Sequence, residues 1–98
     1  MSQIDYSAKV NGIHVAFRAK LNWSGTIKVS MYVTLPKGKS LKSYGFMAGG
    51  HHQIHLTEVI NFGKYVRLDF DMAWSKEVYA PYVACCILTG NITGLVVK

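Results

Sequence analysis

The sequence lacks the segments that direct proteins into or across membranes. No hydrophobic run approaches the roughly 20 residues that a transmembrane helix requires. The N-terminal residues Met1 to Asp5 have neither a basic head nor an apolar core, so they do not resemble a signal peptide. We therefore expect a cytoplasmic or virion-associated protein without a signal peptide or a membrane span.

Cysteine is scarce too. The two cysteines, Cys85 and Cys86, are adjacent. Consecutive residues of a strand point to opposite faces of a sheet, so these two should not form a disulfide with each other. We expect both to act as small buried hydrophobic residues.

Acidic residues are few, and only one, Asp5, lies in the first 42 residues. The chain has 11 Lys and Arg against 5 Asp and Glu, a net charge of +6. Residues 43–98 contain equal numbers of acids and bases, so the whole excess lies in residues 1–42. A one-sided charge of this kind attracts anions and predicts an acidic partner, either nucleic acid or an acidic protein surface.

Sustained helical periodicity is missing as well. Apolar and polar residues instead alternate with a period of two, and turn signals recur every eight to twelve residues or so. The expected strands cover residues 3–10, 13–21, 26–34, 41–48, 52–60, 65–74, 82–88 and 92–97. This pattern predicts one all-β domain over residues 1–98, an antiparallel β-sandwich of seven or eight short strands, with a small β-barrel as the alternative.

Turn chemistry fixes the register of the first two hairpins. Asn11-Gly12 predicts a two-residue turn that places Asp5 opposite Arg18. A three-residue loop with Gly25 in the left-handed region places Lys20 opposite Lys28.

A further hairpin is expected around residues 61–64. Its simplest register places His55 opposite Asp71 and Thr57 opposite Asp69. That register turns Glu58 inward, and a β-bulge that turns Glu58 outward is the alternative.

The basic residues of the first half are the main candidate site. Four of them share the outer face of the predicted sheet and three lie in or after the following loop. Together, the candidate residues for binding an anionic partner are Lys9, Arg18, Lys20, Lys28, Lys37, Lys39 and Lys42. The simpler interpretation is a solvated lysine-rich face that keeps the protein soluble.

A second hypothesis is a lectin-like module that binds carbohydrate. Aromatic residues at the ends of a sandwich can stack on sugars. The candidates are Trp23, Trp74, Tyr79 and Tyr82. Packing of these rings over the ends of the core is the alternative.

Self-association is expected from the last two predicted strands, which are apolar on both faces. Without a helix to cover them, one face would pack either under a loop or against a second copy. The predicted self-association residues are Val83, Cys85, Ile87, Leu95 and Val97.

No arrangement of residues indicates an enzyme, a cofactor or a metal site. His51 and His55 would lie about 13 Å apart along a strand, too far to bind one metal ion. A bend at Gly49-Gly50 could bring His51 or His52 near His14 or His55, but no cysteine or carboxylate completes an obvious set of ligands. Gly38-Lys39-Ser40 resembles the last three residues of a phosphate-binding loop. That motif also needs a glycine five residues before Gly38, and Val33 occupies this position. The sequence therefore predicts a non-enzymatic binding and assembly module, such as a small phage or viral accessory protein.

Overall fold

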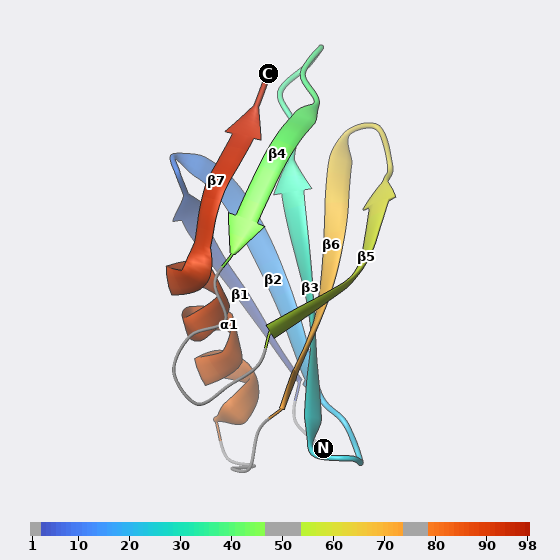
Figure 1. The fold of residues 1–98 in the computed structure, drawn as a ribbon, viewed down its shortest axis with the longest axis vertical. Helices are drawn as coiled ribbons and strands as arrows, with labels where there is room; N and C mark the ends of the chain where they lie inside the picture. The colour runs from blue at the N-terminus through green and yellow to red at the C-terminus, as the bar shows by residue number, and fades with distance from the viewer. Residues whose placement is uncertain (1–2, 47–53, 74–78) are drawn as a thin grey trace.

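A five-stranded antiparallel sheet organises the molecule (Figure 1), which the computed structural model describes over residues 3–46, 54–73 and 79–98. The sheet order is β1-β2-β3-β6-β5. Its strands are β1 (Gln3–Val10), β2 (Ile13–Leu21), β3 (Thr26–Thr34), β6 (Tyr65–Ala73) and β5 (Ile54–Asn61). Strands β4 (Leu41–Phe46) and β7 (Ile92–Val97) form a separate two-stranded sheet, and helix α1 (Ala80–Asn91) leads into β7.

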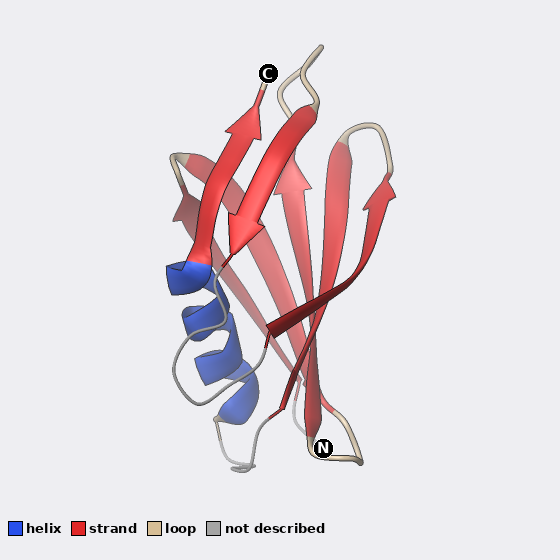
Figure 2. Ribbon diagram, viewed as in Figure 1, coloured by secondary structure: helices blue, strands red, loops and turns tan. Residues whose placement is uncertain are grey.

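Helix α1 and the β4–β7 pair cover one face of the large sheet (Figures 1 and 2). The helix packs against β1, β2 and β3. Phe46 of β4 meets Phe70 of β6 edge to face, with ring centroids 5.5 Å apart. We call the opposite face of the large sheet, turned away from α1 and β4–β7, the outer face.

The core lies between these two layers. Alternate residues of β2, β3 and β6 point inward and are fully buried, while their neighbours point to the outer face. Phe17, Ile27 and Phe70 are the largest of these inward side chains on their strands. Burial of such a continuous apolar face is the main free energy that holds the sheet to its cover.

The predicted class is confirmed, because the described chain is built mostly of strands in antiparallel sheets with a sandwich-like arrangement. The large sheet ends at β1 and at β5, so the described strands do not close into the alternative barrel.

The registers of the first two hairpins are also confirmed. Asp5 lies opposite Arg18, and Lys20 lies opposite Lys28. Gly12 and Gly25 have φ angles of 80° and 76°, the left-handed conformation that these turns require.

The prediction of a strand over residues 82–88 is wrong, because these residues lie inside α1. Pro81 occupies the first turn of this helix, where its missing N–H costs nothing. The buried residues Pro81, Ala84, Cys85 and Leu88 follow the i, i+3, i+4, i+7 spacing of a helix. Apolar residues between them fill the other side of the helix and hide this period in the sequence.

The expected register of the third hairpin is correct at one end only. His55 lies opposite Asp71, as predicted, but Glu58 and not Thr57 lies opposite Asp69. A β-bulge between Leu56 and Glu58 causes the shift, and Glu58 is exposed. The alternative interpretation of Glu58 as an outward-turned residue is therefore the correct one.

Candidate nucleic-acid interface

The outer face carries the polar residues of the large sheet. Because side chains alternate along each strand, β1, β2, β3 and β6 present every second residue there. Lys9, Arg18, Lys20 and Lys28 all lie on this face, as predicted. The three remaining predicted bases do not: Lys37 and Lys39 lie in the β3–β4 loop, and Lys42 lies on β4 in the covering layer.

Acidic residues share this face with the bases. The Arg18 Nε atom donates a hydrogen bond of 2.9 Å to Asp5 Oδ1. Strand β6 lies beside β3 and places Asp71 opposite Lys28 and Asp69 opposite Ser30. The face expected from the first half of the chain alone is thus partly neutralised by acids from the second half.

The hydrogen bond and charge of Asp5 raise the pKa of the Arg18 guanidinium, which stays charged throughout the accessible pH range. Lys20 is flanked by Gln3 and Lys28, and Lys9 lies opposite His14. These two lysines therefore have no carboxylate directly opposite them among the described strands. An anionic ligand would relieve the repulsion between Lys20 and Lys28.

A row of aromatic rings crosses the end of the outer face nearest the β5–β6 turn. Tyr32 of β3 and Tyr65 of β6 have ring centroids 5.7 Å apart. Phe62, in the turn, stacks on Tyr65 with centroids 4.8 Å apart and an interplanar angle of 24°. We call Tyr32, Tyr65 and Phe62 the aromatic row.

Basic groups accompany this row. The Arg67 guanidinium carbon lies 5.7 Å from the centre of the Phe62 ring, within the range of a cation–π contact. Arg67 Nε also lies 3.1 Å from Asp69 Oδ1. Both atoms are buried, yet neither completes a hydrogen bond among the described residues. The Arg67 guanidinium is therefore held between the Phe62 ring and the Asp69 carboxylate.

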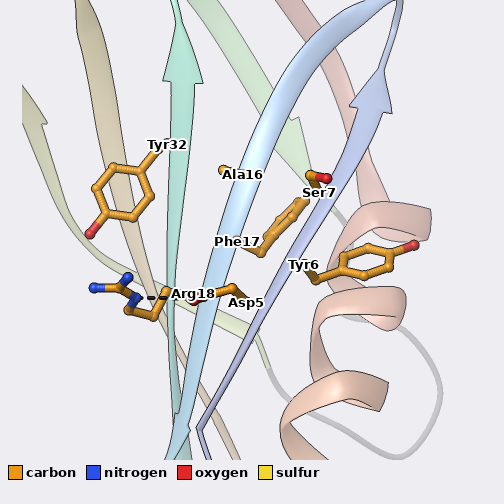
Figure 3. A pocket seen from close by; sticks show the side chains of 7 residues that line it. All are labelled: Asp5, Tyr6, Ser7, Ala16, Phe17, Arg18 and Tyr32. Atoms are coloured by element: carbon orange, nitrogen blue, oxygen red, sulfur yellow. Dashed lines mark hydrogen bonds and ion pairs between the residues drawn. The ribbon is translucent and has the colours of Figure 1, made fainter.

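A shallow hollow of about 270 Å³ adjoins the row at Tyr32 (Figure 3). The small residues Ala16 and Ser7 lie in one cross-strand row with Tyr32, and the Arg18–Asp5 pair lies in the adjacent row. The ring of Tyr6 points toward α1, on the other side of the sheet from Tyr32. An aromatic wall beside an arginine suits a flat ring that carries or adjoins negative charge.

A second hollow, of about 210 Å³, lies at the other end of β3. It is lined by Lys20, Lys28, Trp23 and the adjoining residues Leu21 and Asn22. The Trp23 side chain is 94% exposed. This hollow again combines lysines with an aromatic ring.

More lysines gather where the β3–β4 loop meets the chain's last residues. Ser40 and Lys98 exchange two backbone hydrogen bonds, of 2.7 and 3.0 Å, and the Leu35 amide donates to the Lys64 carbonyl at 2.9 Å. These contacts bring together segments that are distant in sequence. The lysines in or next to them are Lys37, Lys39, Lys42, Lys64 and Lys98.

The described residues of the predicted carbohydrate site come from separate segments. Trp23 belongs to the β2–β3 turn, whereas Tyr79 and Tyr82 lie at the start of α1. Tyr82 packs edge to face on Tyr6 of β1, with centroids 5.5 Å apart. Trp74 lies outside the described residues.

The predicted self-association residues do not form one exposed face either. Cys85 and Leu95 are buried in the core of their own chain, and Ile87 and Val97 pack against that core. Val83 is half-buried. Residues 82–88 belong to α1, and the buried side of this helix packs on the large sheet of the same chain.

No metal site is visible in the part of the chain that the structure describes, where no three His, Cys, Asp or Glu side chains come together. His51 and His52 lie outside these residues. Over the same residues, no helix is long and apolar enough to span a membrane.

Three residues in or beside the aromatic row were not identified from the sequence, namely Phe62, Tyr65 and Arg67. Residues 61–64 were seen only as a turn, and the pairing of β6 with β3 joins segments more than 30 residues apart. The alternation of Tyr65, Arg67 and Asp69 on one face was the available signal. No protein-family model, curated protein or solved structure matches this chain, so its function is inferred from its own geometry.

Proposed function

We propose that this chain is a non-enzymatic protein that binds single-stranded nucleic acid on the outer face of its large sheet. The observation that carries the proposal is the aromatic row with Arg67 beside Phe62. Proteins that bind single strands combine aromatic rings, on which bases stack, with basic residues that follow the phosphates.

The binding path runs along β3. It begins at the hollow beside Trp23, Lys20 and Lys28, passes the hollow between Arg18 and Tyr32, and ends at Phe62. Nine strand residues span about 30 Å, enough for roughly four or five nucleotides. An acidic protein would be attracted by the same lysines, but it would make no use of the aromatic row, at whose end Phe62 is 47% exposed.

Fluorescence anisotropy with a labelled single-stranded oligonucleotide tests the proposal. Affinity should fall steeply as the salt concentration rises, because the Lys and Arg side chains displace counterions from the phosphates. Phe62→Ala and Tyr32→Ala should each weaken binding by about 1–3 kcal/mol, the value of one stacked base.

Tyr44→Ala is the matched control, since Tyr44 is an exposed aromatic residue on β4, in the covering layer. It should leave affinity unchanged. Equal losses in the three variants, or binding that does not respond to salt, would refute the proposal. Binding of neutral oligosaccharides that depends on Trp23 would favour the carbohydrate hypothesis instead.

A further inference from the structure

We infer that two copies of this chain pair through the free edge of β1, so that their large sheets join into one continuous sheet. This interface adjoins the proposed nucleic-acid site, because Asp5 and Ser7 also line the hollow beside Tyr32, but its formation does not depend on nucleic-acid binding. The occupant of the β1 edge is a second copy of the same chain, because the sequence of β1 is complementary to itself.

Strand β1 has a regular edge that no described strand covers. It pairs with β2 over eight consecutive residues without a register shift, and it is the last strand of the sheet on that side. A long, regular edge strand exposes a row of backbone donors and acceptors that another strand can use.

The side chains of β1 select one register for such a pair. If both cores are to lie on the same side of the joined sheet, residues that face each other must point to the same side. With Ser7 opposite Ser7 at the two-fold axis, Asp5 faces Lys9 of the second copy. On the core side, Tyr6 then faces Ala8, and Ile4 faces Val10.

Charge distinguishes this register from its neighbour. A shift that places Tyr6 on the axis sets Asp5 opposite Ser7 and Lys9 opposite Gln3, so neither charge is compensated. In the favoured register each Asp5 lies between Arg18 of its own chain, at 2.9 Å, and Lys9 of the second copy. The two-fold axis forms this arrangement twice.

Helix α1 supports the same interface. It contains no charged residue, and a helix that is apolar on all sides is normally covered on all sides. Its Tyr82 side chain lies over the β1 edge, in edge-to-face contact with Tyr6, and remains 48% exposed. In the favoured register the small Ala8 of the second copy faces Tyr6, which leaves room for the Tyr82 ring at the junction.

A cysteine placed on the axis tests the register directly. Residues directly opposite each other in an antiparallel pair have Cα atoms about 4.5–5.5 Å apart, and a disulfide bridges that distance. Ser7→Cys should therefore form a disulfide-linked dimer under mild oxidation. Gln3→Cys is the matched control, because residue 3 is exposed on the same face of β1 and carries no charge, and its two copies would lie about 26 Å apart along the strands and should not crosslink.

Charge reversal tests the Asp5–Lys9 pairs in sedimentation experiments without nucleic acid. Lys9→Glu and Asp5→Lys should each shift the protein toward monomer, and a mixture of the two variants should form a mixed dimer. Circular dichroism checks that each variant is folded. A wild-type protein that remains monomeric at high concentration overturns the inference, as does a dimer in which Gln3→Cys crosslinks as readily as Ser7→Cys.

Discussion

Lys28 of β3 lies directly opposite Asp71 of β6 on the outer face of the large sheet. The two residues come from halves of the sequence that differ strongly in net charge. Their pairing shows that the basic half does not form a sheet of its own, since β6 brings its carboxylates next to the basic residues of β3. These acids reduce the positive potential along the proposed binding path.

Removal of the Asp71 carboxylate should strengthen binding of single-stranded nucleic acid. Asp71→Asn leaves Lys28 uncompensated, and the expected gain is about 0.2–1 kcal/mol, the range for an exposed charge pair. Anisotropy titrations at several salt concentrations measure the effect. Asp71→Glu keeps the charge and should bind like the wild type, so a gain in that variant would argue against an electrostatic cause.

The helical assignment of α1 makes a prediction about stability. Leu88 is fully buried, and Leu88→Ala should lower the free energy of unfolding by about 2–5 kcal/mol. Ile87 is only half-buried, so Ile87→Ala should cost less. Urea denaturation gives both values. If residues 82–88 formed the strand expected from the sequence, Ile87 would share a face with buried Cys85 and would cost as much as Leu88 or more.

Replacement of two glycines by alanine should change the stability of the protein in opposite directions. Gly90 lies inside α1 with open space around the position of an added Cβ, so Gly90→Ala should stabilise the protein by about 0.4–1 kcal/mol. At Gly45 an added Cβ would lie 2.9 Å from the Thr93 carbonyl oxygen, which is too close. Gly45→Ala should destabilise the β4–β7 pair by about 1–3 kcal/mol. Thermal denaturation of both variants should show melting temperatures on opposite sides of the wild type.

Alkaline pH should destabilise the fold through Cys85. Burial raises the pKa of this thiol to about 12 from its ordinary value of 9.0, with smaller effects from Cys86 and Asp5. Above pH 9 the unfolded chain releases the thiol proton while the folded chain retains it. The free energy of unfolding should therefore fall between pH 9 and pH 12, by up to about 1.4 kcal/mol for each pH unit.

Cys85→Ala isolates this contribution. Its stability deficit relative to the wild type should shrink as the pH rises from 9, because only the wild type carries the buried thiol. Tyr6 and Tyr82, whose pKa values are raised by Cys86, remain in both proteins. A deficit that stays constant from pH 8 to pH 11 would contradict the assignment.

The parts of the fold that depend on local chemistry were predictable from the sequence. Asn11-Gly12 and Gly25 determine two hairpin turns, and alternation then fixes which residues face each other. The bases Arg18, Lys20 and Lys28 could be placed on one face for the same reason. With Lys9, four of the seven residues predicted to bind an anionic partner could thus be placed from turn chemistry and alternation alone.

The rest depends on packing between distant segments. Helix α1 was mistaken for a strand because Val83, Cys86 and Ile87 make its second side apolar, although Pro81 marks a helix start. The aromatic row needs β6 beside β3, which no local pattern specifies. The β-bulge near Glu58 likewise became visible only once both strands were paired.

The same bulge has a consequence for how far this protein can assemble. A sheet with two regular edges can add copies at both ends and grow into a fibre, whereas pairing at one edge about a two-fold axis stops at two copies. At β5 the register shift between Leu56 and Glu58 makes the second edge irregular, a common protection against strand addition. In the proposed β1 dimer, this irregular edge would leave each pair without a regular strand at its ends, so assembly would stop at two copies.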